Sequence, residues 1–367
     1  EPQNLFDETC FGKWVHEGDL TITPDTDPAS LLCMSGVKGT VWISGFAGPL
    51  PLELRGLKSV TGGLVILGNE GLASLHGLEC VRSTSGLEIS ENPVLTDISA
   101  LRLTSSRIIS IRLNPQLESA IALSSVADVT SLSFLGNERL EVLPELLPSV
   151  QLRHLAIEAC PALEGLDALS AARGMSNPVP PMTISLRDNK SLSSIVGIAG
   201  LWSEGSVPEV VTLEQLPSLK SLAGLDGLGE VTFLTISDLS ILEDLSGLKG
   251  LEFASHIRLE DLPSLSSLDG LGALQEAELL RIGGCGEANS GLDGLLDLSG
   301  LGGVSALGVL ALANNDALNS LAGMPLLTEG PFELYASDNS NLQLDEINTF
   351  VSQHNVLSVC ASPPQVD

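Results

Sequence analysis

Apolar residues recur along this chain in a fixed order that repeats about every 23 residues. Residues 64–69 read Leu-Val-Ile-Leu-Gly-Asn and are followed by Leu72, Leu75 and Leu78. One period later, residues 87–92 read Leu-Glu-Ile-Ser-Glu-Asn and are followed by Leu95, Ile98 and Leu101. The shared template is L-x-I-x-x-N-x-x-L-x-x-L-x-x-L. Self-similarity at a period of this length is typical of solenoid repeats.

The asparagine position of the template can be followed along most of the chain. The twelve residues at this position are Asn69, Asn92, Asn114, Asn137, Cys160, Asn189, Leu216, Leu239, Leu262, Cys285, Asn315 and Asn339. Successive steps are 22–24 residues except for three of 29, 27 and 30, where proline and small polar residues interrupt the template at 174–182, 202–209 and 286–302. Two further L-x-I-like segments, 20–22 and 41–43, precede them, so we count fourteen coils.

The L-x-I core of each coil predicts a short strand. Its two apolar side chains point to one face and the residue between them to the other. A single strand of this kind cannot bury its apolar face, whereas stacked coils share one interior. The pattern therefore predicts a mostly β solenoid with a continuous parallel sheet, built from about 14 coils of about 23 residues.

The asparagine is expected to line a corner of each coil. Its amide can bond backbone groups of the turn that would otherwise be buried without partners. Leu216, Leu239 and Leu262 replace it in the middle of the chain, so we expect an apolar corner there. Cys160 and Cys285 also occupy the position, and we interpret both as small buried residues rather than disulfide partners.

The two ends of the repeat are predicted to be capped. Cys10 and Cys33 bracket the first coil, which favours a disulfide there and an exported protein. Leu344, Ile347, Phe350 and Val351 recur at helical spacing, so residues 344–353 are predicted to form an amphipathic helix over the last coil. The expected organisation is a cap with the first coil (1–40), a solenoid (41–342), a helical cap (343–360) and a tail (361–367).

The beginning of the chain resembles a known family. Residues 17–22 read EGDLTI, residues 32–43 read LCMSGVKGTVWI and residues 56–66 read GLKSVTGGLVI. Together with Cys10, they resemble the receptor L-domain, a leucine-rich-repeat-like right-handed parallel β-helix of insulin-type and epidermal-growth-factor-type receptors. The resemblance implies an extracellular recognition module without catalysis. The chain has more coils than such a domain and no cysteine-rich module, so we expect a bacterial surface or secreted relative, with bacterial leucine-rich-repeat adhesins as the nearest alternative.

The net charge of the chain limits the classes of partner that it is expected to bind. The formal net charge is −29, from 46 acidic and 17 basic residues. Nucleic acid and bare anionic lipid are disfavoured as partners because their phosphates would be repelled. Two interpretations stay open: a solvated surface that keeps a leucine-rich protein soluble, or attraction of cationic partners or divalent ions.

Motifs for chemistry are few. The five histidines are scattered and show no zinc-ligand spacing, and no nucleophile elbow or phosphate-binding loop occurs in its proper context. We therefore predict no catalytic residues, no metal site and no cofactor. Residues 25–27 (Asp-Thr-Asp) are a weak calcium candidate because the remaining ligands are missing. No transmembrane segment is expected either, since the most apolar stretch, 298–313, is short and falls in register with the repeat.

Outward positions of the strands supply the candidate ligand face. Its charged members are Arg187, Glu214, Arg258, Glu260 and Arg281. One interpretation is cross-strand ion pairing that stabilises the sheet, including a Glu158, Arg187 and Glu214 ladder. The other is a surface that hydrogen-bonds a ligand.

Three functions follow from these observations. The first is a non-catalytic, monomeric, extracellular or cell-surface module that binds a protein or carbohydrate through the solenoid face or its longer loops. The second is a structural envelope rod. The third is a polysaccharide-active β-helix enzyme, for which Glu158, Glu214 and Glu260 with Arg187 and Arg258 are the candidate residues.

Overall fold

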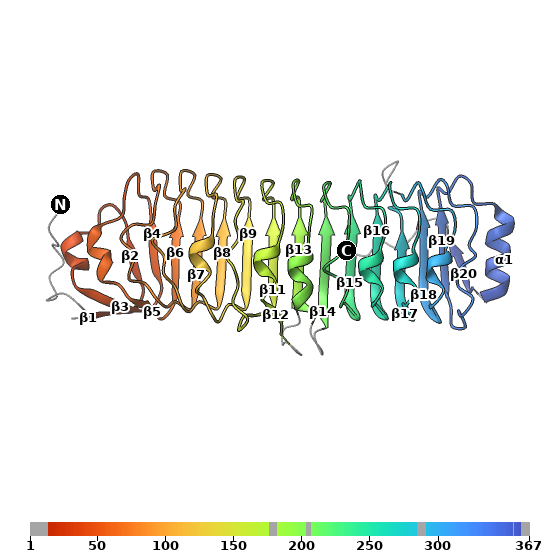
Figure 1. The fold of residues 1–367 in the computed structure, drawn as a ribbon, viewed down its shortest axis with the longest axis horizontal. Coiled ribbons are helices and arrows are strands. Elements are labelled where there is room, and N and C mark those ends of the chain that lie inside the picture. The colour runs from red at the N-terminus through yellow and green to blue at the C-terminus, as the bar shows by residue number, and fades with distance from the viewer. Residues whose placement is uncertain (1–13, 176–181, 203–206, 285–290, 355, 361–367) are drawn as a thin grey trace. The chain divides into compact units, whose positions relative to one another are not determined.

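The computed structural model describes residues 14–175, 182–202, 207–284, 291–354 and 356–360, and the chain forms two compact units. Unit 1 comprises residues 1–163 and 168–173, and unit 2 comprises residues 164–167 and 174–367. Each unit is a stack of coils, and each contributes parallel strands to a sheet (Figure 1).

In the described part of unit 1, seven strands succeed one another in chain order. Each pairs in parallel and in register with the next, for example Leu64 with Leu87 and Leu87 with Ile109. The strands are β2 (Leu20–Ile22), β4 (Val41–Ser44), β6 (Gly63–Leu67), β7 (Gly86–Ser90), β8 (Ile108–Arg112), β9 (Ser131–Leu135) and β11 (His154–Glu158).

Unit 2 repeats the arrangement with eight strands among the described residues, and β13 to β18 are longer than the strands of unit 1. They are β13 (Met182–Arg187), β14 (Pro208–Glu214), β15 (Glu230–Ser237), β16 (Phe253–Glu260), β17 (Glu276–Ile282), β18 (Ala306–Ala313), β19 (Glu333–Ser337) and β20 (Ser358–Cys360). All pair in parallel with their neighbours in chain order.

The predicted parallel β-solenoid is confirmed, and its interior is aliphatic. All fourteen L-x-I-like segments form strands, and their two apolar residues point inward: Leu64, Ile66, Ile257 and Leu259 are 0% exposed. Burying a leucine or isoleucine side chain contributes about 1.5–3 kcal/mol, so the repeated pair stabilises each coil together with the buried leucines that follow it, such as Leu72, Leu75 and Leu78. The strand β20 was not predicted.

Shorter elements complete the coils. Unit 1 has a second small parallel sheet of β1 (Trp14–Glu17), β3 (Met34–Lys38) and β5 (Ser59–Val60). Two-residue strands lie at β10 (Gln151–Leu152) and β12 (Arg173–Gly174). Turns of 3-10 helix span Pro28–Leu31, Leu52–Gly56, Ile121–Leu123, Asp167–Leu169, Val196–Leu201, Ser246–Leu248, Asp269–Leu271 and Ser299–Leu301. Coils pack closely here, since a Cβ on Gly270 would lie 1.9 Å from the Leu245 carbonyl oxygen.

The predicted C-terminal helix is present. It is α1 (Leu344–His354), and Phe350 on its apolar face is 3% exposed. Asp345 and Glu346 lie in its first turn and His354 in its last, which suits the helix dipole. The chain then returns to the sheet as β20, which pairs with β19.

Two sequence predictions fall largely outside the described residues. Cys10 lies outside the described residues, so the Cys10–Cys33 disulfide stays a prediction. Among the described cysteines, Cys80 and Cys160 are free thiols, and Cys33 is not a free thiol. The long interruptions at 174–182, 202–209 and 286–302 are also described only in part.

Candidate functional site

The asparagine positions form a hydrogen-bonded ladder in unit 1. The Asn92 Oδ1 accepts hydrogen bonds from the Asn69 backbone N–H (3.2 Å) and Nδ2 (2.9 Å), and the Asn114 Oδ1 accepts from Asn92 in the same way (3.3 and 3.0 Å). The Asn92 Nδ2 also donates to the Ile66 carbonyl at 3.1 Å. Asn137 accepts from the Asn114 backbone N–H at 3.1 Å. All four asparagines are 0% exposed, so the ladder is a structural feature and presents nothing to a ligand.

The remaining positions of the ladder differ in chemistry. Cys160 is fully buried, and burial raises the pKa of its thiol to about 11. Asn189 is fully buried, as are Leu216, Leu239 and Leu262, which make the corner apolar. Cys285 lies outside the described residues. Asn315 donates from Nδ2 to the Asn339 Oδ1 at 3.1 Å, so the amide ladder resumes at the end of unit 2.

The charged residues predicted for the ligand face pair with one another. Glu260 lies between two arginines: Arg258 forms an ion pair with its Oε2, and Arg281 Nη1 lies 3.7 Å from its Oε1. The side chains of Glu260 and Arg281 are only 8% and 10% exposed. On β13 and β14, Arg187 Nε lies 3.4 Å from Glu214 Oε2. These five residues therefore form two separate ion-paired groups on the sheet of unit 2.

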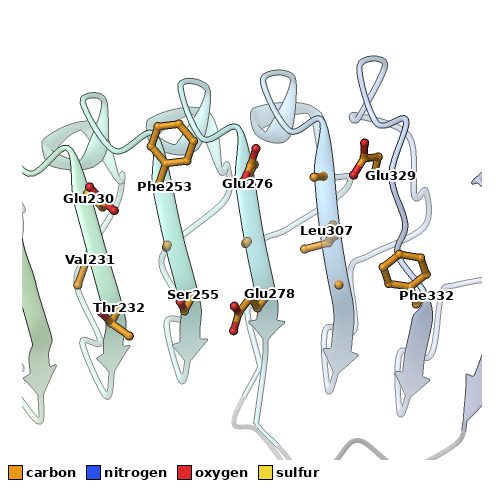
Figure 2. A pocket seen from close by; sticks show the side chains of 14 residues that line it. Glu230, Val231, Thr232, Phe253, Ser255, Glu276, Glu278, Leu307, Glu329 and Phe332 are labelled. Atoms are coloured by element: carbon orange, nitrogen blue, oxygen red, sulfur yellow. The ribbon is translucent and has the colours of Figure 1, made fainter.

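A groove on the same sheet was missed by the sequence reasoning. It crosses strands β15 to β18 near their beginnings and ends beside the start of β19, with a volume of about 460 Å³. Glu230, Phe253, Glu276 and Glu329 lie side by side across the strands, and Glu278 and Phe332 lie in a second row (Figure 2). The other lining residues are aliphatic or small, such as Ser255 and Gly308.

The groove is acidic, and its acids are not neutralised. The side chains of Glu230, Glu276, Glu278 and Glu329 make no hydrogen bond or ion pair within the described part of the chain. All four are exposed, and the lining contains no lysine or arginine among these residues. Phe253 and Phe332 are 36% and 54% exposed. Two phenyl rings thus stand in water beside four uncompensated carboxylates.

The repeat itself aligns the first row of the groove. Glu230 is in register with Phe253, Phe253 with Glu276, Glu276 with Ala306, and Ala306 with Glu329. The corresponding sequence steps are 23, 23, 30 and 23 residues. The signal was therefore present in the sequence, upstream of the L-x-I template. The first four members of the row lie four residues before the first inward residue of their coil, and Glu329 lies five residues before Leu334.

The second row of the groove depends on a close approach between strands. A Cβ on Gly308 would lie 2.5 Å from the Glu278 carbonyl oxygen, which no side chain tolerates without a backbone shift. The Phe332 N–H donates to the Gly308 carbonyl at 2.9 Å, which holds the segment before β19 against β18. Glycine at this position therefore allows β18 to approach the backbone of β17 at Glu278, and the hydrogen bond to the Gly308 carbonyl fixes the backbone of Phe332 beside it.

The described residues contain no group of three or more histidine, cysteine, aspartate or glutamate side chains placed to hold a metal ion. None of their helices is long and apolar enough to cross a membrane. A smaller acidic feature lies at the turns after the strands, where burial, a hydrogen bond with Asp238 and the charges of Asp238 and Asp293 raise the pKa of Asp261.

Comparison with known proteins gives a similarity of fold. No protein-family model matches the sequence, and no curated protein matches it. Among solved structures, a leucine-rich-repeat protein of Bacteroides thetaiotaomicron is 13% identical with a TM-score of 0.35, over 89% of this chain and 51% of its own, so this chain spans about half of its length. A leucine-rich-repeat protein of Leptospira interrogans is 14% identical with a TM-score of 0.37, over 94% and 89% of the two chains.

A plant protein belongs to the same group. The leucine-rich-repeat ectodomain of the Arabidopsis thaliana receptor kinase GASSHO1/SCHENGEN3, solved with Casparian strip integrity factor 2, is 14% identical with a TM-score of 0.29, over 89% of this chain and 42% of its own. All three are leucine-rich-repeat proteins, and the similarity of this chain to them is one of fold.

Proposed function

We propose that this protein is a non-catalytic recognition module and that its binding site is the groove on the sheet of unit 2. The observation that carries the proposal is the contrast between two parts of one surface. Arg258, Glu260 and Arg281 form ion pairs with one another. The glutamates of the groove, in contrast, have no partner among the described residues and flank exposed phenyl rings. Exposed aromatic rings at a concave surface are typical of binding sites rather than of solvated faces.

The enzyme alternative loses support from the same geometry. Glu214 and Glu260, two of the carboxylates that a polysaccharide-cleaving site would use, are held by Arg187 and by Arg258 with Arg281. Both carboxylates are engaged in ion pairs, and neither of them lines the groove.

A blocking substitution tests the proposed site. Ser255 lies in the groove and is half-buried, so Ser255→Trp should fill the groove. Ser133→Trp is the matched control, because Ser133 is a half-buried outward residue on β9 of unit 1. We expect a peptide-display library and a glycan array to yield binders of the unmodified protein that are lost on Ser255→Trp and retained on Ser133→Trp. No binders in either screen, or binders indifferent to Ser255→Trp, would contradict the proposal.

We also propose that the protein works outside the cell or at the outer cell surface. The support is the predicted Cys10–Cys33 disulfide, since disulfides persist in oxidising compartments. Mass spectrometry of unreduced proteolytic fragments tests it. A linked pair of peptides containing Cys10 and Cys33 is expected, and two free thiols in protein isolated from its native host would count against export.

A further inference from the structure

We infer that the groove binds a polyproline II segment carrying arginine at every third residue. The inference rests on the proposed function and names the partner class for the same site. It follows from three features of the groove: the spacing of its glutamates, its width, and the position of its phenyl rings.

The spacing comes from the register of the strands. Glu230, Glu276 and Glu329 occupy the first, third and fifth positions of one row, with Phe253 and Ala306 between them. Neighbouring strands lie about 4.8 Å apart, so successive carboxylates of the row stand about 10 Å apart. A polyproline II helix rises about 3.1 Å per residue with three residues per turn, so its residues i, i+3 and i+6 lie on one side about 9.3 Å apart. This match is close.

Other peptide conformations fit less well. An extended β-strand places side chains of one face about 6.7 Å apart. Cations on one face of such a strand therefore do not match the spacing of about 10 Å between the carboxylates of the row. An α-helix with cations at i and i+7 has a suitable repeat of about 10.5 Å but a diameter of about 10–12 Å. The lining takes three residues from each of the crossed strands, for example 230–232 and 276–278, which spans only about 7 Å along the strand direction.

The phenyl rings favour arginine over lysine. Phe253 lies between Glu230 and Glu276 in the row, so a guanidinium that pairs with either carboxylate can also lie against the ring. Arginine forms bidentate pairs with carboxylates and stacks on aromatic faces, whereas the ammonium of lysine is a compact and strongly hydrated charge. Phe332 offers the same contact near Glu329 at the other end.

The probes are three peptides, whose affinities are measured by calorimetry at low and at physiological ionic strength. The first is Arg-Pro-Pro-Arg-Pro-Pro-Arg, the second has the same composition with its three arginines adjacent, and the third is a helical peptide with arginines seven residues apart. We expect the first to bind most tightly. Replacing its arginines by lysine should weaken binding to the unmodified protein more than to Phe253→Leu.

Two protein variants distinguish binding by the groove glutamates from attraction of the peptide by the overall negative charge of the protein. The triple substitution of Glu230, Glu276 and Glu329 to Gln should lower the affinity for the first peptide about 30-fold, because each exposed ion pair contributes about threefold. The matched control replaces Glu70, Glu138 and Glu141 by Gln, three exposed glutamates of unit 1 without ion pairs among the described residues. This control changes the net charge equally and should leave the affinity unchanged.

Three results would overturn the inference. They are equal affinity for spaced and adjacent arginines, tighter binding of the helical peptide, or equal weakening by the groove triple and the control triple. If no arginine peptide binds but the library screen yields binders blocked by Ser255→Trp, the inference falls and the proposed site stands. If neither yields a binder, both fall.

Discussion

Asn92 in the ladder of unit 1 offers the sharpest test of how this repeat is stabilised. Asn92→Ala removes the acceptor of the Asn69 backbone N–H and the donor to the Ile66 carbonyl, and Asn69 and Asn92 are both 0% exposed. Each buried polar group left without a partner costs about 1–3 kcal/mol. The two orphaned groups together with the lost side-chain bonds predict a decrease of about 3–5 kcal/mol in the free energy of unfolding.

The assay is urea unfolding followed by circular dichroism, with the dependence on urea compared between variants so that a change in stability is separated from a change in the unfolded state. Asn341→Ala is the control, because Asn341 is exposed and should change stability by less than about 0.5 kcal/mol. If Asn92→Ala costs no more than this control, the ladder does not stabilise the corner and the reasoning is wrong.

Three further predictions concern charge and thiol chemistry. Glu260→Gln removes the carboxylate that pairs with Arg281, whose side chain is 10% exposed, so urea unfolding should show a loss of about 3 kcal/mol, and no change would refute the pairing. The pKa of Asp261 is raised on folding, so its contribution to stability is full below the unfolded value of about 3.8 and is lost as the pH rises through the folded value. Asp261→Asn should therefore gain stability relative to the unmodified protein at pH 7, and the gain should shrink towards pH 4; a pH-independent difference would argue for a backbone effect alone. Since burial raises the pKa of the Cys160 thiol to about 11, iodoacetamide at neutral pH should label the half-buried free thiol of Cys80 and spare Cys160 until the protein unfolds, as read by mass spectrometry.

The strands could be predicted because burial acts on them directly. In each coil the L-x-I pair must face the shared interior, so alternation alone locates a strand such as β7 or β16. The strand β20 was missed because residues 358–360 read Ser-Val-Cys, which lacks the leucine template. Its place follows from pairing with β19 after the helix α1, and pairing of this kind leaves little trace in a segment of three residues.

The site was harder to predict because outward positions carry no burial constraint. Sequence reasoning selected Arg258, Glu260 and Arg281 for their charge, and the structure joins them in one ion-paired group. To predict the groove, one would have to know that Glu230 and Glu329, which are 99 residues apart in the sequence, lie in one row. Their alignment follows only when the strand register is continued through the long step between β17 and β18, where the template is interrupted.

Carboxyl labelling with and without a bound ligand tests the central claim most directly. A water-soluble carbodiimide with an amine converts exposed carboxylates to amides, and mass spectrometry reports the extent at each residue. With a ligand selected on the unmodified protein, labelling of Glu230, Glu276 and Glu329 should fall while that of Glu243, exposed on the same unit, stays constant. Unchanged labelling in the groove, with protection elsewhere on the protein, would contradict the assignment of the binding site.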